Sequence, residues 1–200
     1  FTDNLLPRYA SEDIFTRIGS LPKDLALFAE IRPTISPDLL RKLAAAGVGE
    51  VQIGIEALSS RLLKKLNKGT SAIQNLETIK HCEALGIKQT SNLILCFPGS
   101  DQEDVRQTLR TLDFAASFRP LKTVYFWLGV GSRVYRDPSR FGIKAVTNPP
   151  PYRAFFPAEV TGSVRLLVQA YRGDRTAQER LWRSVKEKVR QWKADYADLT

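Results

Sequence analysis

The stretch EVQIGIE, residues 50–56, decides the fold class, because apolar residues alternate along it with polar or small ones. Val51, Ile53 and Ile55 share one face of the predicted strand, and the residues between them form a polar face. Strands of a parallel sheet that helices cover on both sides are apolar throughout. The polar face therefore favours a (β/α) barrel, whose lumen opens into a binding site, over an open doubly wound sheet.

Segments on both sides of this strand continue as an alternation of strands and helices. Apolar runs predict further strands at residues 25–32, 87–97 and 121–128. Cap residues and terminal glycines predict the intervening helices, over about residues 10–20, 36–47, 59–66, 70–86 and 100–118. Strands that alternate with such helices pair in parallel through right-handed crossovers. We therefore expect an α/β fold, a partial (β/α) TIM-like barrel with mostly parallel strands.

The alternation fades from about Arg133 onward. The stretch NPPPY, residues 148–152, predicts an extended linker. Beyond it, apolar residues recur at helical spacing, first at Val164, Leu167, Val168 and Tyr171 and then from Leu181 to Trp192. We therefore expect the C-terminal part of a barrel at residues 1–157 and a helical extension at residues 158–200.

Length and composition limit the class of protein. With 200 residues, 43% of them hydrophobic and 26% charged, the chain has an ordinary globular balance. No apolar run approaches the ~18 residues that span a bilayer, and two cysteines cannot form a disulfide scaffold. The chain starts with Phe1, contains no methionine and shows no signal peptide, which predicts a cytoplasmic segment of a longer protein with upstream domains.

The chain is basic, with 30 Lys and Arg against 21 Asp and Glu and a net charge of +9. A basic surface can concentrate the protein on nucleic acid or on an acidic peptide. Most moderately basic proteins bind neither, so a solvated surface is the alternative interpretation. Charge alone does not decide between them.

The residues most often used in catalysis and metal binding are scarce. His81 is the single histidine and adjoins an apolar helical stripe that includes Ile73, Ile79 and Cys82, so we expect a structural role for it. Cys96 ends a predicted strand and either faces a pocket or is buried. The spacing of the two cysteines does not match a zinc or iron–sulfur motif, so we expect no metal ligands in this segment.

Three motifs follow one another on successive βα units: GIE at residues 54–56, NKGT at 67–70 and FPG at 97–99. This order resembles the radical S-adenosylmethionine (radical SAM) superfamily, and AEIRP at 29–33 fits the preceding element. Residues 131–152 are similar to the subgroup that joins a cobalamin-binding domain to the barrel, including peptide-maturation enzymes. The resemblance covers about residues 1–157.

The resemblance implies three cofactors: S-adenosylmethionine, a four-iron four-sulfur cluster and, through an upstream domain, cobalamin. Family members hold the cluster with three cysteines of a CxxxCxxC loop, which this chain lacks. Any such loop would lie upstream of Phe1, and we expect the segment to be inactive alone. A second departure is Cys96, which stands where a glycine often precedes FPG.

The resemblance also implies roles for particular residues. Glu56, at a strand end, suits the ribose hydroxyls of S-adenosylmethionine, and Lys68 suits its carboxylate. Further cofactor contacts are expected at Gln52, Asn92, Phe97, Pro98, Gly99 and Gly129, and lumen or substrate contacts at Asp3, Glu30 and Arg32. The alternative for each is a structural polar network that fills the barrel.

The implied reaction is reductive cleavage of S-adenosylmethionine to a 5′-deoxyadenosyl radical, which abstracts hydrogen from a peptide or small-molecule substrate. Two alternatives remain open. One is a radical SAM enzyme that modifies tRNA or another RNA, which the positive charge permits. The other is a non-catalytic binding module whose parent lost the cluster loop. No membrane partner is expected.

Overall fold

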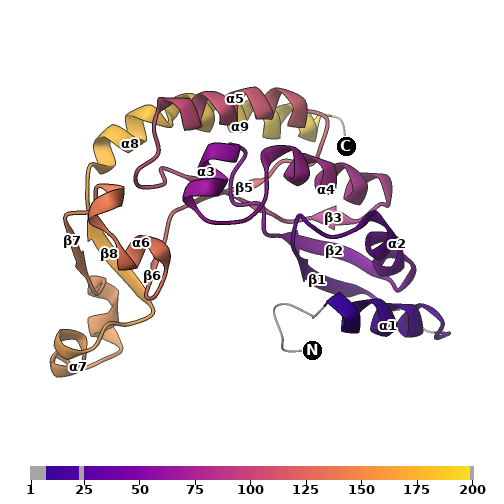
Figure 1. Cartoon of the computed structure of the whole chain (residues 1–200), viewed down its shortest axis with the longest axis horizontal. Coiled ribbons are helices and arrows are strands. Elements are labelled where there is room, and N and C mark those ends of the chain that lie inside the picture. The colour runs from indigo at the N-terminus through magenta and orange to yellow at the C-terminus, as the bar shows by residue number, and fades with distance from the viewer. Residues whose placement is uncertain (1–7, 23–24, 199–200) are drawn as a thin grey trace.

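The computed structural model describes residues 8–22 and 25–198, which form an open arch (Figure 1). One leg carries β1, β2 and β3, the other carries β6, β7 and β8, and helices form the outside of the span. Asp3, predicted to face the lumen, lies outside the described residues. Among the described helices, none is long and apolar enough to cross a membrane.

Five parallel strands form the barrel segment. β1 (Leu27–Ile31), β2 (Val48–Ile53) and β3 (Lys88–Gln89) pair in that order, and β4 (Asn92–Leu95) pairs with β5 (Lys122–Tyr125). A single bridge between Glu56 and Leu93 connects the two sets. The expected α/β fold with a partial barrel and mostly parallel strands is therefore confirmed, and the described strands do not close into a complete barrel.

The strand predicted over residues 87–97 is divided into β3 and β4. At the break, Ser91 Oγ accepts a hydrogen bond of 3.2 Å from the backbone N–H of Ile53. The side chain of Gln89 accepts one of 2.9 Å from the N–H of Ser91. Side chains here replace the backbone partners of a regular strand ladder. The ladder is therefore interrupted and the chain bends, while the N–H groups of Ile53 and Ser91 keep a hydrogen bond.

Helices cover the outer face of these strands. They are α1 (Arg8–Gly19), α2 (Pro37–Ala45), α3 (Ser60–Lys65), α4 (Ala72–Ala84) and α5 (Gln102–Ala115). Ser36, Ser59, Ser71 and Asp101 cap four of them, as hydroxyl and carboxylate side chains do at helix starts. One prediction was wrong in detail: Ile73 is 75% exposed, because it points away from the sheet that Ile79 and Cys82 contact.

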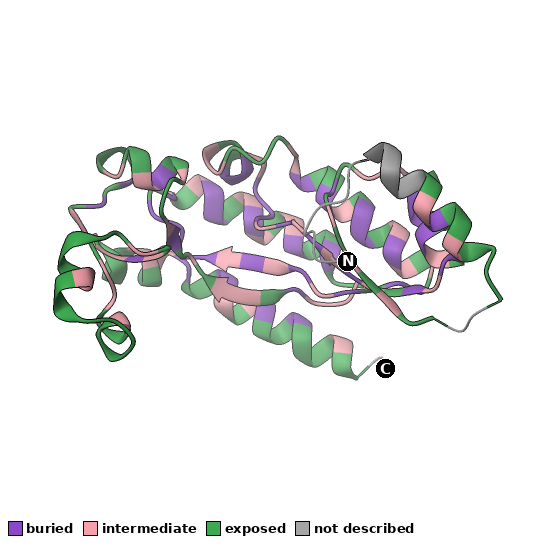
Figure 2. Ribbon diagram, turned by 90° about the horizontal axis from the view of Figure 1, so that it is seen from below, coloured by how far each residue is buried: buried purple, intermediate pink, exposed green. Residues whose placement is uncertain are grey.

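The strands are buried on one face only. Val51, Ile53, Leu93 and Leu95 pack in the core beneath the helices, and the residues between them are half-buried, as the alternating colours of Figure 2 show. The inner, concave face of the arch is therefore the polar face that the sequence predicts. It is the face on which the site is built.

The C-terminal part contains a second, antiparallel sheet. β8 (Val168–Arg172) lies between β6 (Leu128–Gly129) and β7 (Ala145–Thr147). The remaining elements there are α6 (Arg133–Arg136), the 3-10 turns Ser139–Phe141 and Pro150–Ala154, α7 (Ala158–Ser163), α8 (Arg175–Leu181) and α9 (Arg183–Ala197).

Two sequence predictions fail in this part. The helix expected over residues 164–171 is wrong, because β6 and β7 offer two open edges whose backbone groups residues 168–172 satisfy as a strand. The linker expected at 148–152 is not extended throughout. It ends in a 3-10 turn in which the N–H of Tyr152 donates a hydrogen bond to the carbonyl of Pro149. α8 and α9 confirm a helical C-terminus, while a domain boundary at residue 157 stays a prediction.

Candidate functional site

Polar residues from neighbouring strands meet on the concave face. Glu30 of β1 and Gln52 of β2 are direct partners in the parallel register, so their side chains lie side by side. Asn92 of β4 alternates with the buried Leu93 and is half-buried on the same face. The structure thus brings these three predicted site residues to one face, with Glu30 exposed near the open edge.

Glu56 follows β2 in a left-handed backbone conformation, with φ of 60°. Its carbonyl accepts a hydrogen bond of 2.8 Å from Ile94, and Asn75 of α4 holds the residues on both sides. The Asn75 Nδ2 donates to the carbonyls of Ile55, at 3.1 Å, and Ala57, at 2.8 Å. Because Asn75 is fully buried, these bonds fix the loop that presents Glu56.

Lys68 is placed by the end of α3. Asn67 adopts φ of 57°, and the N–H of Lys68 then bonds to the carbonyl of Leu63 at 3.0 Å, as in a Schellman-type helix end. Lys68 Nζ lies 3.3 Å from Glu56 Oε1. It also lies 3.7 Å from where a Cβ on Gly54 would stand, so the glycine leaves room for the ammonium group.

The Glu56–Lys68 pair contributes little to stability. Both side chains are about one-third exposed, at 29% and 33%, and ion pairs of this kind contribute up to ~1 kcal/mol. A left-handed conformation at a non-glycine residue costs about 1 kcal/mol or more. Strain next to a weak ion pair is typical of a site built for a ligand.

A second strained residue stands at the end of β4. Cys96 has φ of 55°, which explains why a glycine suits this position in the family. Its thiol lies 3.8 Å from the carbonyl of Gln178, and burial raises its pKa above the ordinary value, against the opposing effect of Lys186. Of the described non-glycine residues with positive φ, two of three thus end neighbouring strands of the site.

The FPG turn is anchored in the core. Phe97 is fully buried and meets Phe126 and Phe141 edge to face, with centroids 5.0 and 5.8 Å apart. Its carbonyl already accepts a hydrogen bond of 3.0 Å from the N–H of Ser100. Gly99 has φ of 76°, and a Cβ on it would stand 3.3 Å from Cδ1 of the Phe141 ring, close enough to crowd it. The turn is positioned to support a ligand through Pro98 and Gly99 more than through the Phe97 side chain.

Side chains of helix α8 and of the residue after it form hydrogen bonds with Ser100, which follows the same turn. Gln178 Oε1 accepts from Ser100 Oγ at 2.7 Å, and its Nε2 donates to the Ser100 carbonyl at 3.0 Å. Trp182 Nε1 donates to Ser100 Oγ at 2.8 Å from a fully buried position. A short buried network thus ties the FPG turn to residues almost 80 positions later.

The two remaining predicted site residues, Gly129 and Arg32, lie in different places. Gly129 belongs to β6, where it pairs with Val168 and its carbonyl accepts from Ser132, so its backbone is already engaged in the antiparallel sheet. Arg32 directly follows the Ile31–Ile53 pair, so it stands beside Gly54 at the C-terminal end of β1, and its side chain is exposed. Gly129 therefore lies away from Glu56, whereas a contact of Arg32 with a substrate stays a prediction.

Sequence reasoning missed Asn75, Ser100, Gln178 and Trp182. Asn75 had a signal, since an amide within the stripe that Ile79 and Cys82 define has to find buried partners. Gln178 and Trp182 had none, because the distance in sequence hides their contact with the turn.

The cysteines do not fit a four-iron cluster. Such a cluster takes three thiolates from the family loop, whereas this chain has two cysteines. Burial in α4 raises the pKa of Cys82 to about 12, which keeps that thiol protonated. Among the described residues no group of three or more His, Cys, Asp or Glu could hold a metal ion. We derive no step through a cluster held by these residues.

Comparison with protein families identifies the class. Residues 3–112, more than half of the chain, match the Radical SAM superfamily, and the chain therefore belongs to this superfamily. Over 99 residues it is 27% identical to the uncharacterized methyltransferase PH0819 of Pyrococcus horikoshii, an alignment that covers 49% of this chain and 22% of that protein.

Solved structures show the same fold. The radical S-adenosylmethionine methyltransferase TsrM from Kitasatospora setae matches over 92% of this chain and 39% of its own, with a TM-score of 0.59 and 17% identity. The archaeal Elp3 of Methanocaldococcus infernus matches over 64% and 31%, with a TM-score of 0.50 and 20% identity. The chain thus spans less than a quarter of the curated relative and under two fifths of these structures.

Proposed function

We propose that this chain is the S-adenosylmethionine-binding part of a radical SAM enzyme that methylates or otherwise modifies a peptide or small molecule. The observation that carries the proposal is the Glu56–Lys68 pair, 3.3 Å apart above Gly54 on the concave face. Membership of the superfamily supports the cofactor. The names of the relatives, which include methyltransferases, support the reaction class.

The chemistry of the pair matches the two polar ends of the cofactor. A carboxylate accepts hydrogen bonds from both hydroxyls of a ribose, which is the role proposed for Glu56. An ammonium group binds a carboxylate, the role proposed for Lys68. Because their mutual ion pair is weak, a ligand that offers each a better partner replaces it at small cost.

The other polar residues complete the proposed site. Gln52 and Asn92 flank Glu56 on the concave face, where their amides can donate to and accept from the cofactor or substrate. Pro98 and Gly99 provide a rigid backbone edge for the adenine. When bound beside a reduced four-iron cluster, S-adenosylmethionine supplies a 5′-deoxyadenosyl radical. Cluster ligands and any cobalamin would come from outside this chain.

The test is the affinity for S-adenosylmethionine of Glu56→Gln and Lys68→Gln, measured by isothermal titration calorimetry. Charge-assisted hydrogen bonds contribute about 1.5–3 kcal/mol, so each variant should bind about ten- to a hundredfold more weakly. The matched control is Glu50→Gln, which breaks the exposed Glu50–Lys88 ion pair of 3.0 Å in the N-terminal half of β2. Unchanged affinity in the Glu56 variant together with a much lower Tm would assign Glu56 a structural role instead.

Formation of 5′-deoxyadenosine by the whole protein, reconstituted anaerobically, separates an enzyme from a non-catalytic binding module. An enzyme should form it in proportion to substrate turnover or in an uncoupled reaction. If the whole protein binds S-adenosylmethionine without cleaving it under reducing conditions, the module alternative is correct.

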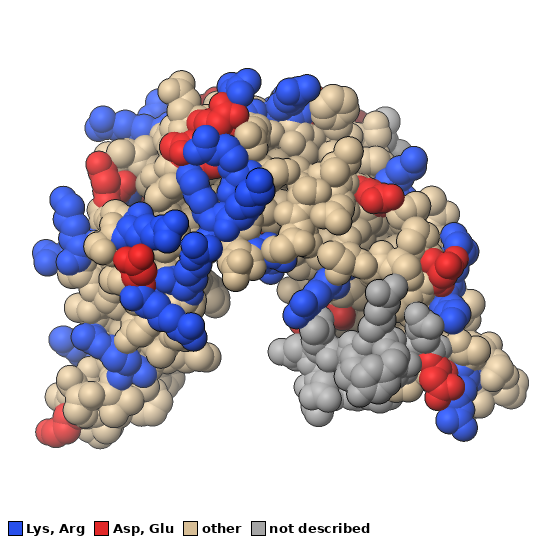
Figure 3. Space-filling view, in the orientation of Figure 1, with Lys and Arg blue, Asp and Glu red and all other residues tan. Residues whose placement is uncertain are grey.

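One observation favours a nucleic-acid substrate as the second candidate. Residues 133–183 contain ten Arg and Lys against four Asp and Glu. None of these ten forms an ion pair with a described carboxylate, and basic side chains gather on the leg of the arch that carries β6–β8 (Figure 3). Binding of tRNA whose log affinity falls linearly with log salt concentration, and weakens when Arg133, Arg136 and Arg140 become Gln, would support this candidate.

A further inference from the structure

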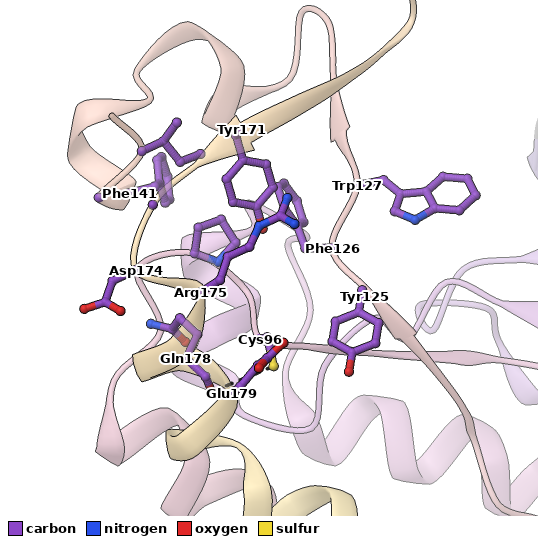
Figure 4. Close-up of a pocket in the computed structure, with 15 residues that line it drawn as sticks. Cys96, Tyr125, Phe126, Trp127, Phe141, Tyr171, Asp174, Arg175, Gln178 and Glu179 are labelled. Carbon is purple, nitrogen blue, oxygen red and sulfur yellow. Dashed lines mark hydrogen bonds between the residues drawn. The ribbon is translucent and has the colours of Figure 1, made fainter. Parts of the chain in front are cut away.

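A cavity of about 530 Å³ lies where the barrel segment meets the C-terminal part. Its walls come from the ends of β4 and β5 (residues 96–99 and 125–127), from residues 141–143, and from residues 171–179 (Figure 4). Pockets for small molecules have volumes of about 300–1,000 Å³. The cavity borders the FPG turn but includes neither Glu56 nor Lys68.

Aromatic side chains form the apolar part of the cavity. Phe126 lies 5.0 Å from Phe97 and 6.2 Å from Tyr171, both centroid to centroid, so two neighbours hold its ring. Trp127 is 76% exposed and, in Figure 4, points away from the other labelled side chains. Fixed aromatic faces bind planar groups with little loss of side-chain entropy.

The polar part contains Arg175 together with the carboxylates Asp174 and Glu179. The guanidinium carbon of Arg175 lies 4.7 Å from the centroid of Tyr171, which holds the flat group against the ring (Figure 4). No described carboxylate lies within 4.0 Å of the Arg175 guanidinium. The neighbouring Asp174 caps the helix, since its Oδ1 accepts a hydrogen bond from the N–H of Ala177. Burial raises the pKa of Tyr171, against the opposing effect of Arg175, so the phenol stays neutral and does not form an ion pair with the guanidinium.

We propose that this cavity binds a planar aromatic molecule or side chain that carries a carboxylate. The carboxylate would pair with the fork of Arg175, which suits it in two parallel hydrogen bonds. The ring would lie against Phe126. The cavity adjoins the proposed cofactor site across Pro98 and Gly99, so a molecule bound there would be the substrate of the reaction. Its role as substrate rests on the proposed function, whereas its binding to the cavity does not.

The probe is indole-3-acetate, with indole-3-acetamide as its uncharged equivalent, and binding is measured by saturation-transfer NMR titration. Arg175→Gln should weaken binding of the acetate about tenfold or more and leave binding of the acetamide unchanged. The matched control is Arg180→Gln, an exposed arginine on the same helix whose side chain does not line the cavity. Phe126→Leu should weaken both probes, because both use the aromatic wall.

Equal affinity for the two probes, or an unchanged acetate affinity in Arg175→Gln, would overturn the proposal. Competition by S-adenosylhomocysteine that requires Arg175 would also overturn it, because the cavity would then belong to the cofactor. Loss of S-adenosylmethionine binding in Glu56→Gln is an independent result. Probe binding without any cofactor binding would reject the proposed function and retain this site.

Discussion

The two sheets of the arch are stabilised in different ways. In the parallel segment, residues 27–125, helices bury one continuous apolar face of the strands, and most of the core lies there. In the antiparallel part, residues 128–172, the turn Pro150–Ala154 and helix α7 contain no buried residue. The first region follows from burial of apolar stripes. The second buries only a few apolar side chains, among them Leu128 and Phe141, and its segment 150–163 requires another source of order.

That source is a polar network centred on Asn148. Its Nδ2 donates to the carbonyls of Thr161 and Val164 at 2.8 and 2.7 Å, and its Oδ1 accepts from Leu166 and Gln169 at 3.0 and 2.6 Å. One amide side chain thus uses all of its hydrogen-bonding capacity to hold the segment that leads into β8. The two regions also differ in the surfaces that they present. The parallel segment presents the proposed cofactor site, and the antiparallel part carries the basic surface.

The largest expected effect tests whether the two regions unfold together. Trp182 is fully buried and bonds to Ser100 at the FPG turn, so Trp182→Ala should lower the free energy of unfolding by about 3–5 kcal/mol. Urea denaturation followed by circular dichroism measures it. Trp182→Phe is the control for the hydrogen bond and should cost less. A loss below about 1 kcal/mol would mean that α8 and α9 are not part of the cooperative core.

The next effect tests the apolar stripe of α4 within the parallel segment. Ile79→Ala should cost about 2–5 kcal/mol, because the side chain is fully buried. Ile73→Ala, on the same helix but 75% exposed, should change stability by less than about 0.5 kcal/mol. Thermal unfolding of both variants checks the pair, and similar costs would contradict the orientation of the helix.

A smaller effect is expected in the antiparallel part. Asn148→Ala leaves four partners without their hydrogen bond and should cost about 1–3 kcal/mol locally. Hydrogen exchange should accelerate at residues 161–172 while the amides of β2 and β4 keep their protection. Asn92→Ala is the comparison in the parallel segment and should leave exchange unchanged in both regions. Uniform acceleration in Asn148→Ala would show that the two regions are one cooperative unit.

The smallest expected effect concerns the pH dependence of stability that arises from Asp101, the residue that caps α5. Burial tends to raise the pKa of Asp101, but the hydrogen bonds from Lys65 and from the N–H of Asp104, with the charge of Arg61, lower it below its ordinary value. A lowered pKa stabilises the fold above the pKa of the unfolded state, and this contribution disappears as the pH falls through the folded-state pKa.

Asp101→Asn keeps the cap and removes the charge, so it should cost under about 1 kcal/mol at pH 7, since Asp101 is half exposed. The difference from the native chain should shrink as the pH falls below about 4. Denaturant midpoints at pH 7, 5 and 3 measure it. Asp38→Asn, in an exposed pair with Arg41, is the control, and a difference that grows in acid would contradict the direction of the shift.

The sequence by itself determined the parallel segment and much of its site. Alternation in residues 50–56 and the caps at Ser36 and Ser59 depend on neighbours a few residues apart, and the GIE, NKGT and FPG motifs are each local. Local physics therefore sufficed to predict the strands and the polar face, and the resemblance to the superfamily pointed to Glu56 and Lys68, which the structure places 3.3 Å apart.

Only the tertiary structure decided the C-terminal part. Residues 164–171 have helical spacing, yet the open edges of β6 and β7 make a strand the better partner for their backbone. The contact of Trp182 with Ser100 and the cavity around Arg175 join segments many residues apart. No local pattern records such contacts, because their free energy arises when distant parts of the chain bury each other.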